Sequence, residues 1–74
     1  MHTNIVKYSE SGKTVLGVVR LTDDGQLQLE GNLPPAIVDT LETERAATKV
    51  SNEAFLIKLT RIFSGTYVKA EYVR

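Results

Sequence analysis

Residues 13–29 read KTVLGVVRLTDDGQLQL, with two β-prone segments on either side of an Asp-Asp-Gly turn. A two-residue loop at Asp24-Gly25 would set apolar side chains opposite polar ones on both faces of the hairpin. A three-residue loop over residues 23–25, with its glycine in the left-handed region, keeps the apolar side chains on one face. It gives the pairs Leu21–Leu27, Arg20–Gln28 and Val19–Leu29. We therefore predict an antiparallel hairpin with this three-residue loop.

A further strand is predicted over Thr3–Glu10, joined to a strand over Lys13–Thr22 by a two-residue loop at Ser11-Gly12. Together with the second hairpin, this register predicts one core face, made of Val6, Tyr8, Val15, Val19, Leu21, Leu27 and Leu29. The opposite face of the sheet then carries Lys7 and three apolar side chains, Ile5, Leu16 and Val18.

A first helix is predicted after Leu33-Pro34-Pro35, with Asn32 as its cap and its end near Arg45. Its apolar residues recur every three to four positions, at Ile37, Val38 and Leu41. Three threonines lower its intrinsic propensity, so this helix is expected to depend on tertiary contacts.

A second helix is predicted over Asn52–Phe63, capped by Ser51 and stopped by Gly65 in the left-handed conformation. Its apolar stripe consists of Phe55, Leu56, Leu59, Ile62 and Phe63. A last strand follows over Thr66–Val73. The order β-β-β-α-α-β predicts an α+β fold in one domain, residues 1–74, with two helices on one face of a mainly antiparallel sheet.

The composition sets limits on the chemistry of the chain. Nine Lys and Arg residues balance nine Asp and Glu residues, and the chain has no cysteine. The lack of cysteine removes disulfides, thiolate metal sites and cysteine nucleophiles. His2 is the single histidine, so a pair of nucleophile and base would depend on it or on a lysine. We therefore expect no enzyme, no cofactor, no metal and no small-molecule substrate.

Two local motifs are best explained as turns. Residues 11–14, Ser-Gly-Lys-Thr, match the end of a phosphate-binding loop, but Lys7 stands where that motif needs its first glycine, and a strand follows. The adjacent carboxylates Asp23 and Asp24 suit a tight turn and have no third metal ligand nearby in sequence.

No apolar run approaches the roughly 18 residues of a membrane span, so we expect no membrane partner. The first residues, Met1–Asn4, have neither the basic nor the apolar region of a signal peptide. The expected location is the cytoplasm.

Spare apolar residues indicate a protein partner. Ile5, Leu16 and Val18 gather on the face away from the predicted core, with Tyr67 and Val73 beside them. A contiguous apolar patch on a small domain is typical of an interaction surface. We expect a homodimer, formed by face packing or by edge pairing of strands, or binding to another protein, for example as an inhibitor or regulator of a larger enzyme. The alternative is that residues 46–50 fold over the patch.

A nucleic-acid-binding module is the alternative from another class. Its contacts would come from basic and aromatic side chains, Lys7, Lys58, Arg61, Tyr67 and Lys69. Such residues on an open sheet stack bases and attract phosphates. The zero net charge and the acidic residues Glu30 and Glu71 on the same side argue against it.

The C-terminal part reads EAFL at residues 53–56, Leu59, and FSGTYVKAE at residues 63–71. This pattern resembles the end of small bacterial proteins of unknown function. The resemblance implies a bacterial or phage origin and an α+β domain, and it brings no catalytic residue to this sequence.

Overall fold

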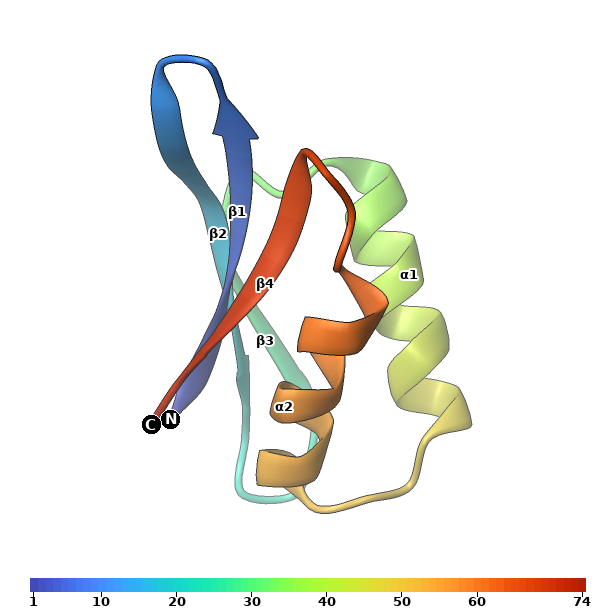
Figure 1. The fold of residues 1–74 in the computed structure, drawn as a ribbon. Coiled ribbons are helices and arrows are strands. Elements are labelled where there is room, and N and C mark those ends of the chain that lie inside the picture. Colours follow the sequence, from blue (N-terminus) through green and yellow to red (C-terminus); the bar gives the residue numbers. More distant parts are fainter.

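The computed structural model, which describes residues 1–74, has the predicted order of elements (Figure 1). The strands are β1 (His2–Ser9), β2 (Gly12–Leu21), β3 (Leu27–Gly31) and β4 (Val68–Val73), and the helices are α1 (Pro35–Ala47) and α2 (Asn52–Ile62). The four strands form one sheet in the order β3-β2-β1-β4, and every neighbouring pair is antiparallel. Both helices cover the same face of this sheet, so the fold is α+β in two layers (Figure 1).

The second hairpin has the predicted register. The pairs Leu21–Leu27, Arg20–Gln28 and Val19–Leu29 are all present. The Thr22 N–H donates to the Gln26 carbonyl at 2.9 Å, which leaves a loop over residues 23–25. Gly25 adopts a φ of 85°, in the left-handed region that favours glycine. Local turn chemistry and the apolar alternation therefore agree at this hairpin.

The first hairpin differs from the prediction, which placed its loop at Ser11-Gly12. The observed pairs are Ser9–Gly12, Tyr8–Lys13, Val6–Val15 and Ile5–Gly17, so the loop is Glu10-Ser11. The register shifts between Ile5 and Val6, because β2 supplies one more residue there, Leu16. Such a β-bulge changes which side chains face the core.

The bulge moves apolar residues between the two faces of the sheet. Ile5 enters the core and Leu16 packs against it, whereas both were predicted on the opposite face. Tyr8 and Val15, predicted in the core, lie on the face without helices, together with Val6. A tyrosine in a small core needs a partner for its hydroxyl, and the observed position gives Tyr8 that partner.

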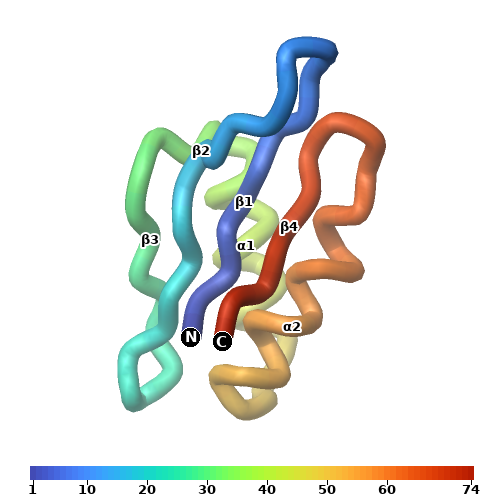
Figure 2. The backbone as a smooth tube through the Cα atoms, turned by 60° about the vertical axis from the view of Figure 1, so that its left-hand side comes forward, coloured from blue at the N-terminus to red at the C-terminus, as the bar shows by residue number.

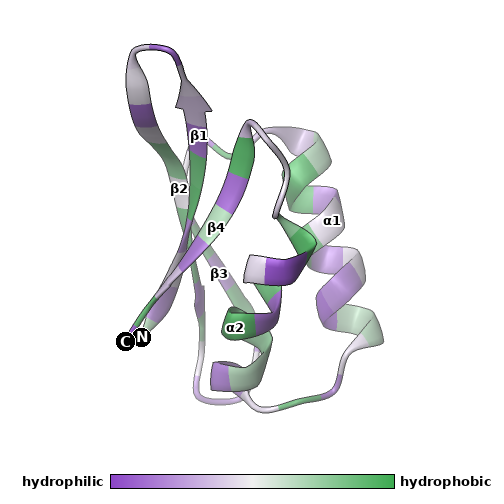
Figure 3. Ribbon diagram, in the orientation of Figure 1, coloured by the Kyte–Doolittle hydropathy of each residue, from purple (hydrophilic) through white to green (hydrophobic).

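The core lies between the sheet and the helices. It consists of Ile5, Val19, Leu41, Phe55, Leu56, Leu59 and Ala70. The alternation of apolar and polar residues along β4, visible in Figure 3, directs Ala70 toward α2 and its neighbours Lys69 and Glu71 away from it. Thr3 is also buried there, and its hydroxyl donates to the Leu56 carbonyl at 2.8 Å.

The helix ends confirm one predicted cap and correct two others. The Ser51 hydroxyl accepts from the Ala54 N–H at 3.2 Å, as predicted for α2. The cap residue of α1 is Pro34 rather than Asn32. The two prolines already have a φ close to the helical value, and because proline has no backbone N–H, they leave no donor there for a side-chain cap to satisfy. Gly65 has no positive φ, and the C-cap residue of α2 is instead Phe63, whose N–H donates to the Leu59 carbonyl.

Residues 46–50, the segment that could have folded over the patch, form the end of α1 and most of the connection to α2, and they stay in the helix layer. Arg45 donates to the Gly25 carbonyl at 2.9 Å and to the carbonyls of Thr48 and Val50 at 3.4 Å. These contacts join the connection to the turn between β2 and β3. The opposite face of the sheet is therefore not covered by this segment, as Figure 2 shows from a second side.

Candidate functional site

The face of the sheet away from the helices is called the open face below. The strand pairing assigns to it the side chains of His2, Asn4, Val6, Tyr8, Lys13, Val15, Val18, Arg20, Gln28, Glu30, Lys69, Glu71 and Val73. Three of them are Lys or Arg and two are acidic. No helix or loop lies over this face (Figures 1 and 2).

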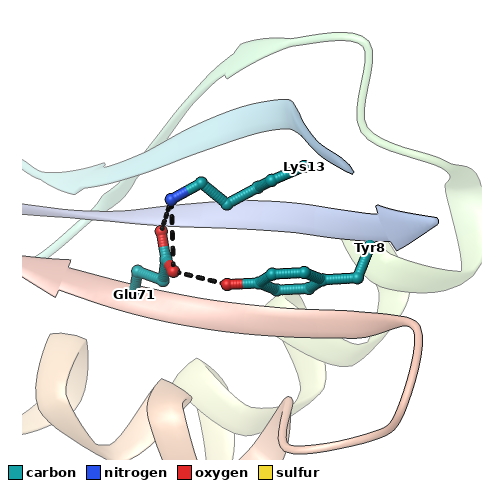
Figure 4. A network of polar contacts seen from close by, with 3 residues as sticks. All are labelled: Tyr8, Lys13 and Glu71. Atoms are coloured by element: carbon teal, nitrogen blue, oxygen red, sulfur yellow. Dashed lines mark hydrogen bonds and ion pairs between the residues drawn. The ribbon is translucent and has the colours of Figure 1, made fainter. Parts of the chain in front are cut away.

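A polar network joins three strands on the open face (Figure 4). The Tyr8 hydroxyl donates to Glu71 Oε2 at 2.8 Å, and Lys13 Nζ lies 3.1 Å from Glu71 Oε1. Lys69 Nζ lies 5.3 Å from the centre of the Tyr8 ring, a cation–π distance. We call these four residues the Tyr8 network. It connects β1, β2 and β4.

The Tyr8 network covers an apolar residue. Val6 lies on the open face between Asn4 and Tyr8, yet its exposed fraction is 0%. Lys13 is opposite Tyr8 and Glu71 is opposite Asn4, so both contacts to Glu71 reach across the position of Val6. The aromatic ring and the aliphatic part of the lysine thus shield Val6 from water while their polar ends remain accessible.

The network holds its groups in fixed protonation states. The hydrogen bonds from Tyr8 and Lys13 lower the pKa of Glu71. The hydrogen bond to Glu71, and then burial, raise the pKa of Tyr8, and the same carboxylate raises the pKa of Lys13. All three shifts move titration further from neutral pH. A general acid or base needs a pKa near the working pH, so these groups are suited to holding the surface together rather than to proton transfer.

The structure changes the predicted interface. Ile5 is buried in the core and Leu16 packs against it, so the proposed contact through these two residues is wrong. The bulge in β2 is the physical reason. Val18 is half-buried on the open face. Val73 also lies there and is 39% exposed, while Tyr67 precedes β4 and is 70% exposed.

The structure also separates the residues predicted to contact nucleic acid. Lys7 is opposite Val68, which packs on the core side, whereas Lys69 is opposite Val6 on the open face. Lys58 and Arg61 lie on α2, in the helix layer, and Tyr67 precedes β4. Lys58 of that helix donates to the Thr48 hydroxyl at 3.1 Å. The five side chains therefore form no single basic surface.

No sequence pattern predicted that Val6, Tyr8, Lys13 and Glu71 form a cluster. Lys13 and Glu71 are 58 positions apart, and no local pattern links them. One signal was present: Tyr8 was assigned to the core with no partner for its hydroxyl. Moving it to the other face requires the shift in register that the structure shows.

Two shallow hollows lie outside the open face. One, of about 430 Å³, is lined by polar residues at the turn between β2 and β3 and on α1, including Asp24, Glu42 and Arg45. The other, of about 470 Å³, lies along α2 and includes Val50, Ile57 and Arg61. No group of three or more His, Asp or Glu side chains is placed to hold a metal ion.

Neither helix has the length and apolar character needed to cross a membrane. Comparison of the chain with protein-family models, with curated proteins and with solved structures found no match.

Proposed function

We propose that this chain is a non-enzymatic protein-binding module whose contact surface is the open face of its sheet. One observation carries the proposal: both helices lie on one side, so the other side of a four-stranded sheet is open (Figure 1). Apolar side chains are exposed on it, with Val15 at 52% and Val73 at 39%. Tyr67, next to this face, adds an exposed aromatic ring of the kind enriched at interfaces.

The charges of the open face favour a protein over a nucleic acid. Lys13 is paired with Glu71, and Arg20 Nε lies 3.1 Å from Glu30 Oε1. Lys69 lies over the Tyr8 ring. A surface whose basic groups already have partners gains little by releasing counterions from phosphates. Apolar side chains between paired charges are instead the usual content of a protein interface.

The small core is a second support. Only ten of the 74 residues are buried. Domains of this size have a net stability of about 3–5 kcal/mol, and association is one way to increase it. The partner is another protein, which includes a larger enzyme that the chain would regulate, or a second copy. The proposed location is the cytoplasm, where disulfides are rare and their absence costs nothing.

Capture experiments with matched variants test this proposal. Val15→Glu and Val73→Glu place a carboxylate on the open face, and Val50→Glu makes the same change in the connection between the helices, where Val50 is 43% exposed. Immobilised wild type and Val50→Glu should retain a common protein from an extract of the source cell, and the two open-face variants should lose it.

Equal retention by all four proteins would contradict the open face as the contact surface. A labelled single strand of nucleic acid gives the second arm of the test. Binding that weakens steeply as salt rises, and that is unchanged by Val15→Glu, would replace this proposal with the nucleic-acid alternative.

A further inference from the structure

We propose that β3 is a docking edge for a second copy of this chain, so that two sheets join edge to edge about a two-fold axis. The inference does not depend on binding at the open face, because it uses the free edge of β3 rather than the exposed apolar side chains of β2 and β4. It rests on three observations: which edge is free, which backbone groups point outward, and how the sequence of β3 pairs with itself.

The β3 edge is the free edge of the sheet. In the order β3-β2-β1-β4 only β3 and β4 lack a neighbour on one side. The outer side of β4 is partly occupied, because the Ala70 N–H donates to the Phe63 carbonyl at 3.0 Å and Ser64 forms a bridge to Lys69. Figure 2 shows no segment beside the outer side of β3. An unpaired edge of this kind is a template for another strand.

The register shows which groups of β3 point outward. The pair Thr22–Gln26 is hydrogen-bonded through the Thr22 N–H. Hydrogen-bonded and non-hydrogen-bonded pairs alternate along an antiparallel ladder, so the backbone groups of Gln28 and Glu30 point toward β2. The N–H and C=O groups of the alternate residues, Leu27, Leu29 and Gly31, therefore point away from the sheet.

The β3 sequence, Leu-Gln-Leu-Glu-Gly, is complementary to itself in the antiparallel direction. A two-fold axis at Leu29 sets Leu29 opposite Leu29 of the partner subunit and Leu27 opposite Gly31 of the partner subunit. Every outward-pointing residue then meets an outward-pointing residue. The same register sets Gln28 opposite Glu30 of the partner subunit, where an amide can donate to a carboxylate.

We call the proposed line of contact between two β3 strands the seam, and Leu29 gives it an apolar centre. Leu29 is opposite Val19, a core residue, so its side chain lies on the side of the helices. At the edge, however, it is 37% exposed. Pairing two copies at this position would cover both leucines and extend the apolar layer across the seam. Because the outer side of β4 is partly occupied, the association closes as a dimer instead of continuing as a filament.

Amide hydrogen exchange of the wild type tests the seam directly. In a monomer the Leu29 N–H faces water and exchanges fast, whereas the Gln28 N–H bonded to β2 is protected. In the proposed dimer the protection of Leu29 rises with protein concentration, in step with the dimer fraction from analytical ultracentrifugation. A chain that stays monomeric at the highest soluble concentration, or a dimer in which the Leu29 amide remains unprotected, would overturn the proposal.

A matched pair of variants locates the contact. Leu29→Lys puts two ammonium groups together at the two-fold axis and should weaken self-association about tenfold or more, since like charges directly opposite each other are unfavourable. Val15→Lys makes the same change in charge at an exposed apolar position of the inner strand β2 and should leave self-association unchanged. Dissociation by Val15→Lys but not by Leu29→Lys would show that the copies meet through the open face.

Discussion

Val6→Ala tests whether the Tyr8 network creates a second, small apolar centre on the open face. Val6 is fully buried although no helix covers it. The change removes two methyl groups, worth about 0.8 kcal/mol each, and leaves a small cavity that adds to the loss. The free energy of unfolding should therefore fall by about 2 kcal/mol. For a domain of this length that corresponds to a decrease in Tm of roughly 8–16 °C.

Urea unfolding followed by circular dichroism measures this loss, and Val15→Ala is its control. Val15 is opposite Val6 on the same face of the sheet but is 52% exposed. Removing its methyl groups should cost only about 0.5 kcal/mol, as for most surface changes. The two variants share residue type, sheet and face and differ most in burial. Equal losses for Val6→Ala and Val15→Ala would refute the claim that the polar network shields Val6.

A double-mutant cycle tests whether the Tyr8 ring is the group that shields Val6 from water. In a Tyr8→Ala background the Val6 side chain is already open to water, so removing its methyl groups should cost less than in the wild type. Contacting residues of this kind show coupling energies of about 0.5–3 kcal/mol. Additive effects of the two changes would mean that the tyrosine ring does not shield Val6.

Three further predictions concern charge, backbone space and capping. The pKa of Glu71 is lowered, so its contribution to stability is present above its ordinary pKa of 4.5 and is lost as the pH falls through the lowered value. The pKa of Tyr8 is raised, so its contribution to stability is present below its ordinary pKa of 10.0 and is lost as the pH rises through the raised value. Glu71→Gln should flatten both limbs of the curve of stability against pH, and parallel curves would contradict the network. Gly17→Ala should destabilise the fold by about 1–3 kcal/mol in thermal melts, since a Cβ there clashes with the Glu30 backbone carbonyl and meets the Leu33 side chain at 2.7 Å. Gly65→Ala, with its nearest contact at 3.6 Å, should be neutral in the same measurement. Ser51→Ala removes the α2 cap and should cost about 1 kcal/mol, measured by urea unfolding, with Ser51→Asp restoring most of it.

The two hairpins show what the sequence could and could not predict. At the second hairpin, the left-handed glycine and the apolar alternation independently favour one register, and the structure confirms it. At the first, alternation alone was available. The bulge at Leu16 lies next to a close approach between distant residues: a Cβ at Gly17 would meet the Glu30 carbonyl and the Leu33 side chain. A local pattern does not contain those contacts, and a shift of one residue exchanges the two faces of a strand.

The candidate site was harder to predict for the same reason. Its members are assigned to the open face only once the bulge is known, because the bulge moves Tyr8 out of the core and Ile5 into it. Glu71 then meets Tyr8 across 63 positions of sequence. Val73 of β4, by contrast, was predicted on the face away from the core and lies there, since that strand has no irregularity and its alternation is simple.

The two proposed surfaces of this chain would reinforce each other. A two-fold axis perpendicular to the sheet keeps both open faces on the same side, so edge pairing through β3 would join two four-stranded sheets into one continuous surface. A partner with two matching sites would then bind twice, and the second contact would form at a high effective concentration. Leu29→Lys should therefore weaken capture of such a partner although Leu29 does not lie on the open face, whereas Val15→Glu should abolish capture without separating the dimer. An edge variant without effect on capture would mean that each open face works alone.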